Sequence, residues 1–150
     1  MQEQADVLNH SISHVSRNDY NSLSIVLKIR RAIREETEKG QIAAFIKNEY
    51  EYQLDSHFSE EETMFFAKLP HTDDLRIEAQ RQHDHLKYLA WVCSNGQIPD
   101  SLPGEFADLL EEHIRFEEQT LFPYIQNIPV VKKVNRRRAN VTPSTCYRIL

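Results

Sequence analysis

Two ten-residue stretches of the chain follow one pattern, and this repetition constrains the fold more than any other feature. Residues 57–66 read HFSEEETMFF and residues 113–122 read HIRFEEQTLF. In each stretch a glutamate follows a histidine at the fourth position, and residues at that spacing share one face of an α-helix. An imidazole and a carboxylate that point the same way from each of two helices suit transition-metal ions in the core of a helical bundle.

The apolar residues recur at helical spacing in four parts of the chain. We predict helices over about 17–37, 41–67, 73–94 and 101–127, with turn-forming residues between them. Four helices of similar length with short connections predict an all-α, up-down-up-down four-helix bundle. We expect residues 1–16, which are polar and weakly patterned, to form an N-terminal extension, and residues 128–150 to form a basic C-terminal tail.

Composition narrows the class of protein. The 150 residues suffice for one domain, and 3 Gly, 6 Pro and 2 Cys fit neither a loop-rich fold nor a disulfide framework. Without a signal region at the start or a long apolar run, the sequence predicts a soluble cytoplasmic protein that does not enter a membrane. All 23 acidic residues lie before residue 128, so we expect the bundle not to bind nucleic acid.

The positions of the turns predict which histidines lie at one level of the bundle. Antiparallel neighbours bring two residues to the same height when both are equally far from the connecting turn. The midpoint of His57 and His83 is Pro70, and the midpoint of His83 and His113 is Ile98. Both midpoints fall in predicted turns, so the three histidines should share one layer.

The same construction predicts a partner on the first helix. Reflecting His57 through the first turn gives residues 19–21, where there is no histidine. Tyr20 is the first choice because Leu23 follows it at helical spacing, as expected for an inward position. Asp19 is the second choice.

Neighbouring polar residues have simpler interpretations. One isolated histidine–glutamate pair on a helix is usually a solvated surface pair, and only its repetition favours a metal site. Glu62 and Glu118 should lie on solvated faces, with a reserve role as carboxylate ligands. We also expect His85 to be exposed and Trp91 to lie in the core.

These residues together resemble the hemerythrin-like (HHE cation-binding) domains, which are non-haem diiron four-helix bundles. The resemblance covers about residues 16–127 and rests on three segments: HFSEE from His57, QHDHL from Gln82, and EHIRFEE from Glu112. It implies two iron ions, with manganese or zinc as other candidates, bridged by the two glutamates. The residues that match the family's ligands are His57, Glu61, His83, His113 and Glu117.

The histidine that the family carries on its first helix is absent here. A Tyr20 phenolate or an Asp19 carboxylate could replace it, only one metal could remain, or the bundle could be a metal-free interaction module. The resemblance implies binding or sensing of dioxygen, nitric oxide or peroxide, or the holding of iron. A diiron oxidase, a peroxidase or an enzyme that handles nitric oxide is the alternative.

Overall fold

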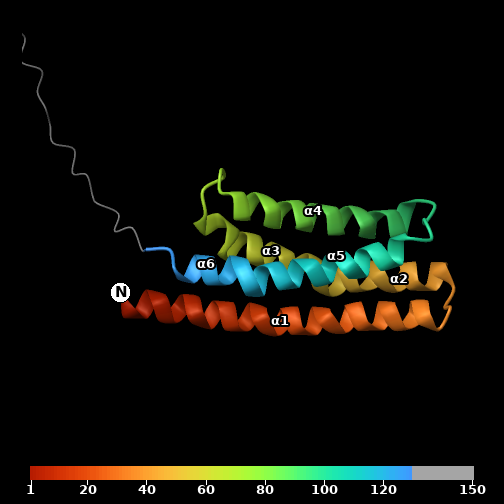
Figure 1. The fold of residues 1–150 in the computed structure, drawn as a ribbon, viewed down its shortest axis with the longest axis horizontal. Helices are drawn as coiled ribbons and strands as arrows, with labels where there is room; N and C mark the ends of the chain where they lie inside the picture. Colours follow the sequence, from red (N-terminus) through yellow and green to blue (C-terminus); the bar gives the residue numbers. More distant parts are fainter. Residues whose placement is uncertain (130–150) are drawn as a thin grey trace, which may run out of the picture.

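The computed structural model describes residues 1–129, and these form four antiparallel rods of helix (Figure 1). The first rod is α1 (Gln2–Arg34), and the third is α4 (Asp74–Asn95). The second rod runs through α2 (Lys39–Glu49), the π-helical turn η1 (Tyr50–Leu54) and α3 (Asp55–Met64), before the short 3₁₀ helix η2 (Phe66–Lys68). The fourth consists of α5 (Leu102–Phe116), the π-helical turn η3 (Glu117–Leu121) and α6 (Phe122–Gln126).

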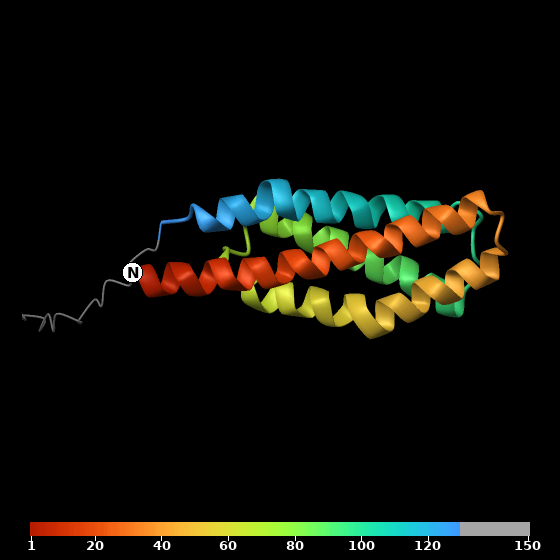
Figure 2. The ribbon, with the colours of Figure 1, turned by 90° about the horizontal axis from the view of Figure 1, so that it is seen from below.

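This arrangement confirms the predicted all-α, up-down-up-down bundle, and there is no strand among residues 1–129. Helix α1 packs along α5 and also contacts α2, α3 and α6, while α4 packs against α2 and α5. Seen from below, α1 lies in front of the other rods, with the second rod on one side and the fourth on the other (Figure 2). Most of the predicted basic tail, residues 130–150, lies outside the described residues.

The start of the third rod follows from local chemistry. Asp73 caps α4, because its Oδ1 atom accepts hydrogen bonds from the backbone N–H groups of Leu75 (2.9 Å) and Arg76 (3.2 Å). These donors have no partner within the helix, so an acidic cap fixes where the helix begins. The helix predicted over 73–94 therefore lies within a residue of the observed one.

The prediction that residues 1–16 form an extension before the first helix is wrong. Helix α1 begins at Gln2, and the side chains of Ile12 and Val15 are buried. They pack with residues near the ends of α3 and α6, among them Phe65 and Ile125. The first helix therefore extends the hydrophobic core over its N-terminal half.

The core consists of two hydrophobic clusters separated by a polar layer. One cluster lies toward the α1–α2 and α4–α5 turns and includes Ile29, Leu86 and Leu110. The other lies toward the opposite end and includes Val15 and Phe122. On α1 and α4 the buried polar residues lie between the segments that contribute to the two clusters, and on the other two rods they lie where these segments meet.

Two further findings concern the surface. Trp91 is 56% exposed and stacks on Tyr88 on the outer face of α4, so the prediction that it belongs to the core is wrong. Among residues 1–129, no helix combines the length and the apolar character that crossing a bilayer demands.

Candidate metal centre

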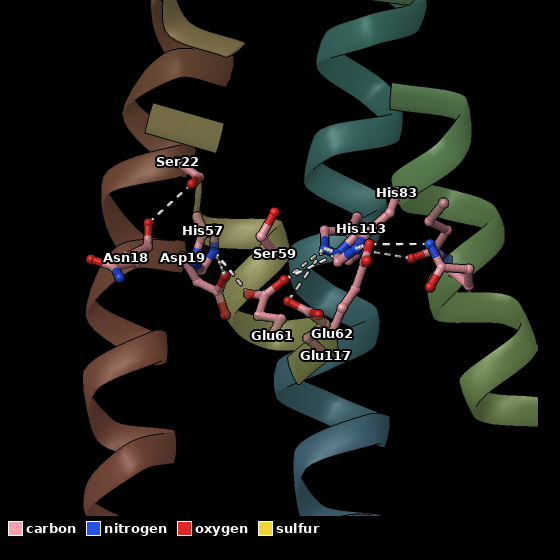
Figure 3. Close-up of polar contacts among 12 residues, drawn as sticks. Asn18, Asp19, Ser22, His57, Ser59, Glu61, Glu62, His83, His113 and Glu117 are labelled. Carbon is pink, nitrogen blue, oxygen red and sulfur yellow. Dashed lines mark hydrogen bonds and ion pairs between the residues drawn. The ribbon is translucent and has the colours of Figure 1, made fainter. Parts of the chain in front are cut away.

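The polar layer brings together side chains from all four rods (Figure 3). Each of its members is at most 5% exposed, although all are polar or charged. They are Asp19, Ser22, His57, Glu61, Gln82, His83, His113 and Glu117. Such a concentration of ionisable groups between two hydrophobic clusters is costly unless the groups are paired or bind a cation.

A first group of possible ligands joins α1 to α3. The Nε2 atom of His57 lies 2.9 Å from Asp19 Oδ1 and 2.9 Å from Glu61 Oε1. Asp19, His57 and Glu61 each offer one nitrogen or oxygen, and these atoms lie within 4.8 Å of one another, close enough to bind a single metal ion.

A second group joins α3, α4 and the fourth rod. His83 Nε2 lies 3.0 Å from Glu61 Oε2 and 3.1 Å from His113 Nε2. His113 Nε2 in turn lies 3.3 Å from Glu117 Oε2. These four side chains have the spacing of one metal site, and Glu61 belongs to both groups through its two oxygens. The predicted layer of His57, His83 and His113 is therefore confirmed.

The structure does not place Tyr20 in this layer. Its side chain is 76% exposed, whereas Asp19 is 1% exposed and contacts His57. Successive residues on an α-helix are turned about 100° apart, so the two cannot face the same way. The inward face of α1 passes through Val15, Asp19 and Ser22, which leaves Tyr20 in solvent. The first choice for the partner on the first helix is therefore wrong, and the second choice fits.

Both rods that carry the repeated pattern contain a π-helical turn. The turn η1 precedes His57 by a few residues, and Glu117 is the first residue of η3. Such wide turns are rare and often occur at functional sites, since they redirect the side chains of one turn of helix. They could not be predicted from local residue patterns, because they depend on how each helix packs.

Two histidines of the second group have hydrogen-bond partners on their outer nitrogens. His113 Nδ1 donates to Gln82 Oε1 and His83 Nδ1 donates to Glu62 Oε1, each over 2.8 Å. Glu62 was predicted on a solvated face, but its partly exposed carboxylate reaches into the layer. Glu118 is exposed, as predicted.

His85 was predicted to be exposed, but its side chain is only partly exposed and lies 3.3 Å from Glu105. Sequence reasoning assigned no separate role to Gln82. Its position next to His83, within one residue of the predicted layer, is the signal that could have found it.

Aromatic rings fix the plane of His83. The ring of Phe58 stacks on it with centroids 4.2 Å apart, and the ring of Phe66 stacks with centroids 4.9 Å apart. Because the faces of the imidazole are covered, polar groups reach His83 through its edge, where its two nitrogens lie. Its Nε2 atom is thereby aimed at Glu61 and His113.

Burial divides the carboxylates of the layer into two kinds. Burial raises the pKa of Asp19 and raises the pKa of Glu117 well above its usual range, and in both cases the Glu61 carboxylate adds to the rise. Burial also acts to raise the pKa of Glu61, but the neighbouring imidazoles of His113, His57 and His83 hold it well below its usual range. Without a metal ion, Glu61 therefore carries charge while Glu117 tends to hold a proton.

The histidines are divided in the same way. Burial lowers the pKa of His113 to about 4, so this imidazole is neutral at pH 7. Burial acts to lower the pKa of His57 and of His83 as well, but their carboxylate partners raise both, that of His57 to about 10. Neutral His113 donates from Nδ1 to Gln82, which leaves the lone pair of its Nε2 atom turned toward the layer.

Several buried atoms of the layer have no hydrogen-bond partner among the described residues. They are Asp19 Oδ2, His57 Nδ1, Glu61 Oε1 and both carboxylate oxygens of Glu117. A buried carboxylate with unmet oxygens is strongly destabilising unless it is neutralised or bound. The four carboxylate oxygens among these atoms are hard donors of the type that accompanies imidazole in iron and manganese sites. The residues therefore fit bound metal ions.

Comparison with protein families shows that residues 23–125 match the hemerythrin HHE cation binding domain. The match spans more than half of the chain. The chain belongs to this family. Neither the curated proteins nor the solved structures include a significant match.

The matched residues of this HHE domain hold most of the polar layer, from His57 to Glu117. They begin at residue 23, so the family match does not cover Asp19 and Ser22, the two residues that α1 contributes. The role of Asp19 therefore rests on the geometry of the bundle, in which its carboxylate contacts His57.

Proposed function

We propose that this HHE domain is a non-haem dinuclear metal protein that holds two iron ions and binds or senses a small ligand such as dioxygen, nitric oxide or peroxide. The observation that carries the proposal is the position of Glu61. Its two oxygens face two separate groups of ligand-type side chains, as a carboxylate that bridges two cations would.

In this proposal, one ion is held by Asp19, His57 and Glu61, and the other by Glu61, Glu117 and the two remaining histidines. The three carboxylates compensate most of the charge of two divalent cations, which a buried site requires. Asp19 in place of an imidazole makes the first group richer in oxygen donors, which favours the ferric state of iron.

The chain's own residues hold and shield the ions. The hydrophobic clusters on either side of the layer keep bulk water out, and Phe58 and Phe66 orient His83. Bound iron would supply a coordination position for a diatomic ligand or peroxide.

Iron content tests the proposal directly. Protein purified without chelators and loaded with ferrous iron under argon should hold about two irons per chain, as the paired ligand groups require. Glu61→Ala should lose most of both ions and Glu117→Ala at least one, whereas Glu112→Ala, which removes an exposed carboxylate from α5, should retain both. Equal iron in wild type and Glu61→Ala would refute the shared-ligand assignment.

Nitric oxide tests the ligand-binding part. The ferrous protein should develop new optical and electron paramagnetic resonance signals when nitric oxide is added, and Glu61→Ala should not. If the spectra of the iron-loaded wild type do not change with nitric oxide, the proposed metal site stands but nitric oxide is not its ligand.

A further inference from the structure

His83 and His113 belong to the same ligand group but have chemically different partners on their outer nitrogens. The Nδ1–H group of His83 donates to a carboxylate oxygen of Glu62, and that of His113 donates to the amide oxygen of Gln82, both over 2.8 Å. The hydrogen bond to Glu62 is charge-assisted, and such bonds are roughly twice as strong as neutral ones.

The carboxylate of Glu62 is held in place for this contact. The Nε2 atom of Gln80 donates to the same Oε1 atom over 3.1 Å, so the oxygen that faces His83 is fixed from a second side. The side chain of Glu62 is 39% exposed, and a glutamate with such access to water is ionised at neutral pH. The rings of Phe58 and Phe66 stop the imidazole from turning away.

The amide of Gln82 is held just as firmly, but without bringing charge to His113. Its Nε2 atom donates to Glu78 Oε1 over 2.9 Å, and Arg81 donates two hydrogen bonds to the same carboxylate. The negative charge of Glu78 is thus paired with Arg81 on the surface. The oxygen that His113 meets belongs to a neutral group.

We propose that Glu62 is a positioning residue that makes His83 the stronger electron donor of the two histidines and so stabilises the oxidised state of the metal ion they share. This inference rests on the proposed function. A carboxylate that accepts the outer N–H group of a ligand histidine orients the ring and raises its basicity, and loss of such a partner commonly lowers metal affinity 10–100-fold. Gln82 orients His113 in the same way and adds no charge.

The chain offers a matched control for Glu62. Glu60 lies two residues earlier on α3, its side chain is 36% exposed against 39% for Glu62, and its partner is His14, outside the polar layer. Glu60→Gln and Glu62→Gln therefore remove the same charge from similar surroundings. Only the second removes it from the partner of a predicted ligand.

The decisive measurement is the midpoint potential of the iron-loaded protein in a redox titration. Glu62→Gln should raise the potential, Glu60→Gln should leave it at the wild-type value, and Gln82→Glu should lower it. Glu62→Ala should reduce iron affinity by about tenfold or more. Equal potentials in Glu62→Gln and Glu60→Gln would overturn the inference.

A measurement on protein loaded with zinc, which has no redox chemistry, tests the hydrogen bond of His83 independently of iron. In zinc-loaded protein with ¹⁵N-labelled histidine, the Nδ1–H proton of His83 should resonate at low field. It should move upfield in Glu62→Gln and stay in place in Glu60→Gln. If this resonance does not move in Glu62→Gln, the inference is overturned while the proposed function stands. If the wild-type protein binds no metal, both are overturned.

Discussion

Asp19 is the residue in which this site differs most from the family pattern that the sequence suggests. Its carboxylate takes the place expected for an imidazole on the first helix, and its neighbour Tyr20 points into solvent. If the proposed dinuclear site is correct, Asp19→Ala should lose the ion proposed between α1 and α3 and keep about one per chain, because the second ligand group does not include Asp19. Tyr20→Phe should keep both ions. Metal analysis of the two variants beside wild type gives the answer.

Asp19→His provides the control for this prediction, since an imidazole restores a metal ligand at the same position. It should recover the iron lost in Asp19→Ala. Loss of iron in Tyr20→Phe, or full iron in Asp19→Ala, would contradict the assignment.

The choice between these neighbours marks the limit of sequence reasoning at the residue scale. Reflection through the predicted turn located residues 19–21 at the correct level. It could not decide which of them faces inward, since an error of one residue turns the side chain by about 100°. The histidine–glutamate pairs of the repeated pattern were easier, because the spacing within each helix constrained them. His83 followed from the positions of two turns.

At the scale of elements, the N-terminal half of α1 belongs to the core. Val15 is fully buried among residues of the second cluster, whereas Val7 on the same helix is 63% exposed. Val15→Ala should cost about 2 kcal/mol of unfolding free energy, from the lost methyl groups and the cavity they leave. Val7→Ala should change it by less than about 0.5 kcal/mol. Urea unfolding of both variants measures their free energies of unfolding. Equal values would contradict the burial of the N-terminal half of α1.

The N-terminal half of α1 was not predicted as helix from the sequence, and the reason is physical. Its apolar residues, among them Leu8, Ile12 and Val15, are sparse, and the polar residues between them hide the periodicity. They pack against residues near the end of α3 and against α6, which follow about 50 and more than 100 residues later in the chain. The start of α4 was predictable because its signal, the cap at Asp73, is local.

At the scale of the whole molecule, the ionisable layer makes stability depend on pH in the metal-free protein. The pKa values of Asp19, Glu117, His57 and His83 are all raised in the folded chain, so above about pH 6.5 it binds more protons than the unfolded chain. Stability should therefore fall as the pH rises from 6.5 to 8.5, by more than about 1 kcal/mol per pH unit. His113 acts in the opposite direction only below pH 6.5, because its pKa is lowered.

Urea unfolding of chelator-treated protein at three pH values tests this. Glu117→Gln, which removes one titrating group, should give a shallower slope. Metal loading should reverse part of the trend, since the ions displace protons from their ligands and bind more tightly as the pH rises. A metal-free protein that gained stability between pH 6.5 and 8.5 would contradict the assigned shifts.

The fold and the common layer of histidines were predictable because both follow from helical periodicity and turn positions. The hydrogen-bond partners Glu62 and Gln82 were harder, since they depend on side-chain directions across two rods. The π-helical turns and the exposure of Trp91 depend on the packed bundle as a whole, which no local spacing reveals.

The polar layer between two hydrophobic clusters also sets the alignment of the rods. If one helix slid along its neighbours by a single turn, its carboxylate or imidazole would enter hydrocarbon and an apolar side chain would face charged groups. A uniformly leucine-filled interior would tolerate such slippage, as coiled coils without a buried polar position do. The buried acids and imidazoles thus fix the register of the helices along the bundle axis, even before any cation binds.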